Sequence, residues 1–215
     1  MPKTSYDTFL QHIKNEDKEQ AVLYALSLIE EGHISIESLY LDYLARVLIE
    51  FSCDIEDEDI CIWKEHFRTS IIRTILESSY RYILDETKDK EKVNQHIVVL
   101  TPPFEYHEIG AIMSTHFLML EGFKATYIGA NTPKQDILSA IRAYQPEYVA
   151  LSVTNPYNIV ITKQITDEIK RFFPEVKIIL GGQAFANPNV KNALTYDYVL
   201  HSIDDIKAFK KEVTS

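Results

Sequence analysis

The segment "EYHEIG" at residues 105–110 places a histidine between two glutamates, three residues before a glycine. It follows the apolar run "HIVVLTPPF" and precedes a stretch with helical character, "AIMSTHFLMLEG". An imidazole at such a junction can ligate a metal through one nitrogen while a carboxylate holds its other nitrogen. Three interpretations stand side by side: a solvated helix start, a general base and a metal ligand.

Two neighbours of His107 bear on this choice. Glu105 is close enough in sequence to orient the imidazole, and Gly110 would allow a backbone or a bulky ligand to approach closely. Most histidines bind no metal, so the hexapeptide taken alone favours the helix-start interpretation. The elements that surround it in the fold decide its meaning.

From residue 96 onwards, short β-rich runs alternate with helical stretches. This alternation predicts right-handed βαβ units and a parallel sheet, and the near-continuous apolar strands suit a sheet covered on both faces. The predicted strands are "HIVVL", "KATYIGA", "YVALSV", "VKIILGG" and "YDYVLH", and the predicted helices are 108–122, 133–144, 156–172, 188–195 and 204–213.

Three polar or glycine-rich stretches fall directly after predicted strands. They are "TPPFEYHEIG" after the first strand, "SVTNPYN" after the third and "GGQAFANP" after the fourth. Ligands of open α/β sheets bind at the carboxyl ends of the strands, near the point where the strand order reverses. A flavodoxin-like strand order would bring all three stretches to one edge.

The N-terminal part of the chain predicts helices. Four segments with helical apolar spacing and short connections indicate a four-helix bundle, and the charged stretch 85–95 indicates a linker or a solvated helix end. The predicted fold class is therefore α/β, with a four-helix bundle at 1–88 and a flavodoxin- or Rossmann-like five-stranded parallel sheet domain at 89–215.

Composition narrows the functional classes. Hydrophobic residues make up 46% of the 215 residues, which is enough for a core, and the net charge of −10 argues against direct nucleic-acid binding. No apolar run approaches the roughly 20 residues that span a bilayer, and the N-terminus lacks a signal peptide. We expect a cytoplasmic protein without membrane contact, in which Cys53 and Cys61 are reduced.

Several motifs together resemble a known family. The pattern E-x-H-x-x-G after the first strand resembles the D/E-x-H-x-x-G signature of cobalamin (vitamin B12)-binding domains. Ser152-Val153-Thr154 resembles their S-x-T/L motif, and Gly181-Gly182 resembles their paired glycine. The stretch "YIGANTP" at 127–133 is typical of the branch with glutamate in the first motif, the light-sensing and antirepressor-like branch.

The resemblance implies a bound adenosylcobalamin or methylcobalamin whose own base has left the cobalt. His107 would be the lower axial ligand of the cobalt, with Glu105 as its orienting partner and Gly110 close by. The nucleotide tail would pass Ser152, Thr154, Gly181 and Gly182. Without the resemblance, hydroxyl capping and a strand-to-loop turn explain these last residues equally well.

The resemblance also implies that the bundle covers the upper face of the corrin ring. Light-sensing relatives carry W-x9-E-H there, and "ICIWKEHF" supplies Glu65 and His66. Ile55 stands at the tryptophan position, whereas Trp63 lies two residues before Glu65; Glu56 stands where some light sensors have a second histidine. The upper-face residues implied are Ile55, Ile62, Trp63, Glu65 and His66, and the alternative is an exposed polar helix face.

The motifs and the composition leave three functional hypotheses. The first is a non-enzymatic, light-responsive cobalamin sensor that acts through a DNA-binding regulator, another partner or self-association. Since the predicted bundle begins almost at residue 1, we expect no DNA-binding domain of its own. The second is a corrinoid carrier of methyl groups between methyltransferases, and the third is a module that binds another tetrapyrrole or only a protein.

Overall fold

The computed structural model describes residues 4–50, 58–186 and 194–214. The chain divides into two compact units, Met1–Asp85 and Glu86–Ser215, which we call the helical unit and the sheet unit and describe separately. Cys53, Ile55 and Glu56 lie outside the described residues. In the described part of the chain, no helix is long and apolar enough to cross a membrane.

The sheet unit is built on five parallel strands, which confirms the predicted α/β class. Their order, β2-β1-β3-β4-β5, is flavodoxin-like, the case in which the three polar stretches share one edge. All five predicted strands are present. They are β1 (Val93–Leu100), β2 (Phe123–Gly129), β3 (Tyr148–Ser152), β4 (Lys177–Gly181) and β5 (Tyr198–Val199).

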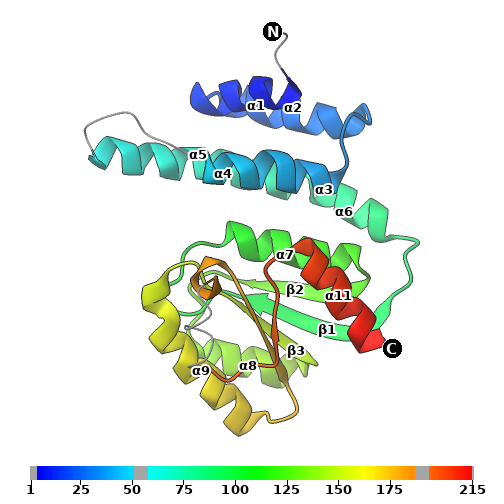
Figure 1. Ribbon diagram of the computed structural model, residues 1–215, viewed down its shortest axis with the longest axis vertical. Coiled ribbons are helices and arrows are strands. Elements are labelled where there is room, and N and C mark those ends of the chain that lie inside the picture. The colour runs from blue at the N-terminus through cyan, green and yellow to red at the C-terminus, as the bar shows by residue number, and fades with distance from the viewer. Residues whose placement is uncertain (1–3, 51–57, 187–193, 215) are drawn as a thin grey trace. The chain divides into compact units, whose positions relative to one another are not determined.

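Helices cover both faces of this sheet. Figure 1 shows α7 and α11 on one face and α8 and α9 on the other. Their bounds are α7 (Ile109–Leu120), α8 (Lys134–Tyr144), α9 (Ile159–Phe172) and α11 (Ile203–Thr214), with 3-10 turns at η2 (Pro156–Asn158) and η3 (Gln183–Phe185). Most of the helix predicted at 188–195 lies outside the described residues.

Burial on both faces explains why the central strands are almost purely apolar. Leu100 of β1 pairs with Leu151 of β3, which pairs with Leu180 of β4, and all three side chains are fully buried. Ile137 of α8 and Ile165 of α9 pack into the same core. The polar residues that come after the strands are thus fixed to a rigid edge.

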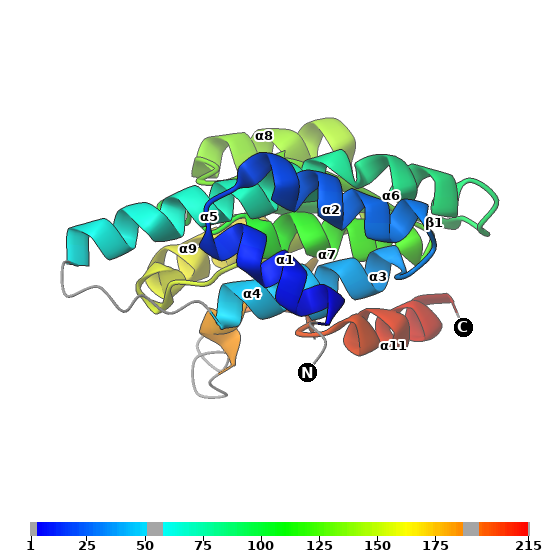
Figure 2. The ribbon, with the colours of Figure 1, turned by 90° about the horizontal axis from the view of Figure 1, so that it is seen from above.

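The helical unit has two layers. Helix α2 packs against both α1 and α5, with α1 and α2 lying over the segment α3–α5 (Figures 1 and 2). The elements are α1 (Ser5–Lys14), α2 (Lys18–Glu30), α3 (Ile36–Ser38), the π-helix η1 (Leu39–Ala45), α4 (Arg46–Ile49), α5 (Glu58–Ser78) and α6 (Tyr80–Thr87), which runs across the unit boundary.

Local signals set most of these boundaries. Ser35 caps α3 through its hydroxyl, and Gly32, with φ +72°, ends the preceding turn. The helical stretch 58–87 is divided into α5 and α6 at Ser79, whose hydroxyl donates to the carbonyl of Leu76 and lies 3.0 Å from the Tyr40 hydroxyl. The expectation of reduced cysteines is wrong for Cys61, which is disulfide-bonded.

Candidate functional site

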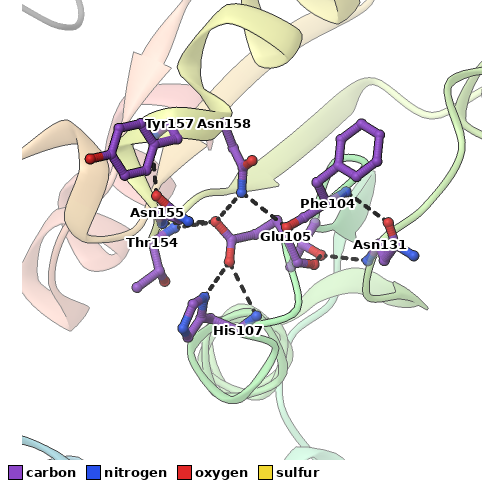
Figure 3. Close-up of polar contacts among 9 residues, drawn as sticks. Phe104, Glu105, His107, Asn131, Thr154, Asn155, Tyr157 and Asn158 are labelled. Atoms are coloured by element: carbon purple, nitrogen blue, oxygen red, sulfur yellow. Dashed lines mark hydrogen bonds and ion pairs between the residues drawn. The ribbon is translucent and has the colours of Figure 1, made fainter.

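A buried carboxylate lies at the centre of the carboxyl edge of the sheet. Glu105, in the loop between β1 and α7, is 0% exposed, and both of its oxygens are engaged (Figure 3). Oε1 accepts the backbone N–H of His107 at 3.1 Å and lies 2.5 Å from Nδ1 of the same residue. Oε2 accepts the backbone N–H groups of Thr154 and Asn155 at 2.9 and 2.8 Å and the Asn158 amide at 3.1 Å.

These donors keep Glu105 ionised. Burial favours the neutral acid and would raise the pKa of Glu105, but the hydrogen bonds outweigh it and the pKa is lowered. The backbone N–H of Asn155 and the His107 ring contribute most to this lowering, followed by the Asn158 amide. The carboxylate is therefore a fixed negative charge that binds two neighbouring loops together.

His107 is held at one ring nitrogen and open at the other. An ionised carboxylate only accepts hydrogen bonds, so Nδ1 carries the proton and Nε2 keeps its lone pair in the neutral ring. The His107 side chain is 60% exposed, and Nε2 has no hydrogen-bond partner among the described residues. This is the arrangement of a metal-binding histidine with a carboxylate behind it.

The helix-start interpretation expected solvated glutamates on both sides of His107, and this is wrong for Glu105. Glu108 occupies the N-cap position of α7 without capping it through its side chain. Its carboxylate instead accepts the hydroxyl of Tyr127 at 3.0 Å. The motif therefore combines a buried carboxylate, an imidazole with one free nitrogen and a second glutamate that is hydrogen-bonded to Tyr127.

The other loop residues predicted for the site lie at the same edge. Ser152 ends β3 beside Gly181 of β4, and Thr154 lies two residues later. The side chains of Ser152 and Thr154 are partly exposed, and their hydroxyls make no hydrogen bond within the described part of the chain. They are thus available to a polar ligand at this edge.

The three glycines predicted for the site differ in how strictly the local structure requires glycine. Gly182 has φ +99°, and a Cβ there would lie 2.3 Å from the Val153 carbonyl oxygen, so the fold itself requires glycine. A Cβ on Gly181 would lie 3.2 Å from the Leu200 carbonyl oxygen. At Gly110 a Cβ would meet no atom within 4 Å, so the space above this residue is open.

The upper-face residues lie on α5 in the helical unit. Ile62 and Trp63 are 53% and 57% exposed, and Glu65 and His66 are exposed as well. The Trp63 ring stacks on Phe67 one turn later, with centroids 5.9 Å apart. The structure therefore shows a solvent-facing group on one helix; Ile55 falls outside the described residues.

Sequence reasoning missed Asn158. Its side chain is buried and donates to the Glu105 carboxylate and, at 3.2 Å, to the carbonyl of Phe104. The stretch "SVTNPYN" marked a polar loop, but an asparagine in such a loop is ordinarily a turn residue. Only the pairing of β1 with β3 brings Asn158 to the motif.

The B12 binding domain family model matches residues 95–205. Among solved structures, the monomethylamine corrinoid protein of Methanosarcina barkeri is 13% identical, with 97% of this chain and 98% of that chain covered at a TM-score of 0.81. A cobalamin-binding protein of Desulfitobacterium hafniense DCB-2 is 18% identical, with 88% and 97% covered at a TM-score of 0.51. At these identities the likeness establishes a shared fold. No protein of curated function matches.

The local geometry agrees with the family match. A single exposed imidazole, fixed through Nδ1, fits a metal that brings its other ligands in a macrocycle, and free hydroxyls beside Gly181 fit a polar tail. The matching model spans more than half of the 215 residues. The chain therefore belongs to the B12 binding domain family, and cobalamin is its cofactor.

Proposed function

We propose that this protein is a corrinoid carrier that passes methyl groups between methyltransferases. The observation that supports this most is the likeness to the monomethylamine corrinoid protein, which extends over 97% of this chain and 98% of that one at a TM-score of 0.81. The likeness thus includes the helical unit as well as the sheet unit.

In this proposal His107 binds the cobalt of cobalamin through Nε2. When bound, cobalamin would supply the chemistry of methyl transfer, and the residues of this chain would hold it. Glu105 holds the ring through Nδ1, stabilises positive charge on the imidazole and prevents the ring from turning. Ser152 and Thr154 offer their hydroxyls to the nucleotide tail.

A cobalamin sensor is the second candidate. It is supported by glutamate, rather than aspartate, at position 105, by "YIGANTP" at 127–133 and by the Glu65-His66 pair. Such a protein would be no enzyme and would act through a DNA-binding regulator or through its own assembly. The two candidates share the lower ligand and differ in the response of the protein once the cofactor is bound.

Reconstitution separates the candidates. Protein is loaded with methyl-, adenosyl- or hydroxocobalamin, and its absorption spectrum and molar mass are measured in the dark and after green light. A carrier should keep its oligomeric state on illumination and lose a labelled methyl group to one methyltransferase of the source organism. A change in assembly on illumination, with the label retained against every methyltransferase, would overturn the carrier proposal in favour of the sensor.

The ligand assignment has its own test. His107→Ala should abolish the spectrum of histidine-ligated cobalamin, because it removes the imidazole whose Nε2 is open for the cobalt. His33→Ala is the matched control, since His33 is an exposed histidine of the helical unit. An unchanged spectrum in His107→Ala would refute the axial role while leaving the family assignment intact.

A further inference from the structure

A second loop holds the backbone directly before the motif. The loop between β2 and α8 carries Asn131, whose Oδ1 accepts the backbone N–H of Phe104 at 2.7 Å (Figure 3). The N–H of Asn131 lies 2.9 Å from both the carbonyl oxygen of Glu105 and the hydroxyl of Thr101. Thr101 donates to the same carbonyl at 2.6 Å. Asn131 thus contacts the peptide groups on both sides of Phe104–Glu105.

Phe104 needs such support because its backbone is strained. Its φ is +67°, in the left-handed region that a bulky side chain rarely occupies. A non-glycine residue held in such a sparsely populated region destabilises the folded state unless its surroundings support it. The Phe104 ring is 68% exposed, so burial of the ring does not offset this cost.

The hydrogen bonds around Phe104 explain how the conformation persists. The turn is closed by the N–H of Glu105 on the carbonyl of Pro102 at 3.1 Å. Asn131 accepts the N–H of Phe104, and Asn158 donates to its carbonyl. Asn131 itself has φ +48°, which asparagine tolerates better than most residues.

We propose that Asn131 is a positioning residue for His107. By holding Phe104 in the left-handed conformation, Asn131 fixes the backbone of Glu105, so that the carboxylate meets Nδ1 of His107. Asn131 acts through the backbone of Phe104 and Glu105 and not on the cofactor. Asn158, by contrast, donates to the Glu105 carboxylate itself. The proposal rests on the axial role of His107 proposed above.

Three substitutions test this role. Asn131→Gly removes the Oδ1 acceptor but keeps a residue that tolerates positive φ, whereas Asn131→Asp keeps both the acceptor and that tolerance. Phe104→Gly removes the strain that Asn131 holds. The readouts are the share of histidine-ligated cobalamin in the absorption spectrum, the cobalamin affinity and the urea unfolding of the cofactor-free protein.

Mutation of an outer-shell partner of a metal ligand typically weakens metal binding about 10–100-fold, and Asn131 is one contact further away. We therefore expect Asn131→Gly to bind cobalamin about tenfold more weakly with a smaller histidine-ligated share, and Asn131→Asp to behave as wild type. Asn15→Gly in the helical unit is the control and should leave the spectrum unchanged. The double variant Phe104→Gly/Asn131→Gly should recover most of the loss, because glycine adopts positive φ unaided.

The results separate the two proposals. A wild-type spectrum and affinity in Asn131→Gly, together with loss of both in His107→Ala, would overturn the positioning role alone. A double variant as impaired as Asn131→Gly would also overturn it, since relief of the strain would then bring nothing back. A wild-type spectrum in His107→Ala would overturn the axial role, and the positioning role with it.

Discussion

Two groups of residues were expected to face the cofactor, and the chain holds them in different ways. The Glu105 carboxylate behind His107 is fully buried and takes donors from the loop after β3 as well as from its own. On α5, Trp63 is 57% exposed and stacks on a neighbour of its own helix. The first group is fixed by hydrogen bonds from two loops of the sheet unit, whereas the second projects from a single helix.

The largest effect should come from Gly182→Ala. A methyl group there would lie 2.3 Å from the Val153 carbonyl, at a φ of +99° that alanine disfavours. We expect a loss of about 3 kcal/mol in the free energy of unfolding, measured with urea. Gly110→Ala is the matched control: its Cβ meets nothing, so stability should be unchanged or higher. Equal losses of stability in both variants would contradict the inference that folding alone fixes the carboxyl edge of the sheet.

Glu105→Gln should have the next largest effect. The amide keeps the shape but cannot accept from five donors, so some N–H groups lose their partner. Hydrogen bonds to a charged group contribute about 1.5–3 kcal/mol, and we expect a loss of that size in unfolding free energy. Cobalamin binding should weaken about 10–100-fold. If Glu105→Gln binds cobalamin and unfolds as wild type does, the hydrogen bonds of the Glu105 carboxylate do not hold His107 in place.

Low pH should remove the stabilisation that the ionised Glu105 carboxylate contributes. The pKa of Glu105 is lowered in the folded protein, so the stabilisation is fully present above the ordinary glutamate pKa of about 4.3 and is lost as pH falls through the folded value. The difference in unfolding free energy between wild type and Glu105→Gln should therefore shrink below about pH 4.3. A difference that stays constant from about pH 7 to about pH 3 would show that the charge of Glu105 contributes nothing.

The smallest effect on stability should come from α5. Trp63→Ala and His66→Ala remove exposed side chains, so the free energy of unfolding should change by no more than about 0.5 kcal/mol. If these residues contact the upper ligand, the relative affinity for adenosyl- and methylcobalamin should change instead. A loss of stability comparable to that of Gly182→Ala would mean that α5 is as fixed as the loops, and the contrast would disappear.

The sequence predicted the elements that have local signals. The five strands follow from apolar runs, and the contact between Glu105 and His107 follows from their short spacing. Asn158 and Asn131 were not predicted as part of the motif, because they lie 53 and 27 residues from the groups they bind. Such contacts depend on which strands are neighbours and on the shape of each turn. Ser79, where the helical stretch 58–87 is divided, likewise contacts Tyr40, 39 residues away.

The many partners of Glu105 also constrain how this protein can diverge. Its carboxylate binds the loop after β3 and its carbonyl binds the loop after β2, so three segments far apart in sequence share one residue. Aspartate is one methylene shorter and would not reach both sets of donors without a shift of the main chain. Replacing only one of these loops with that of a relative that carries aspartate should therefore disrupt the fold. Exchanging all three loops together should preserve it.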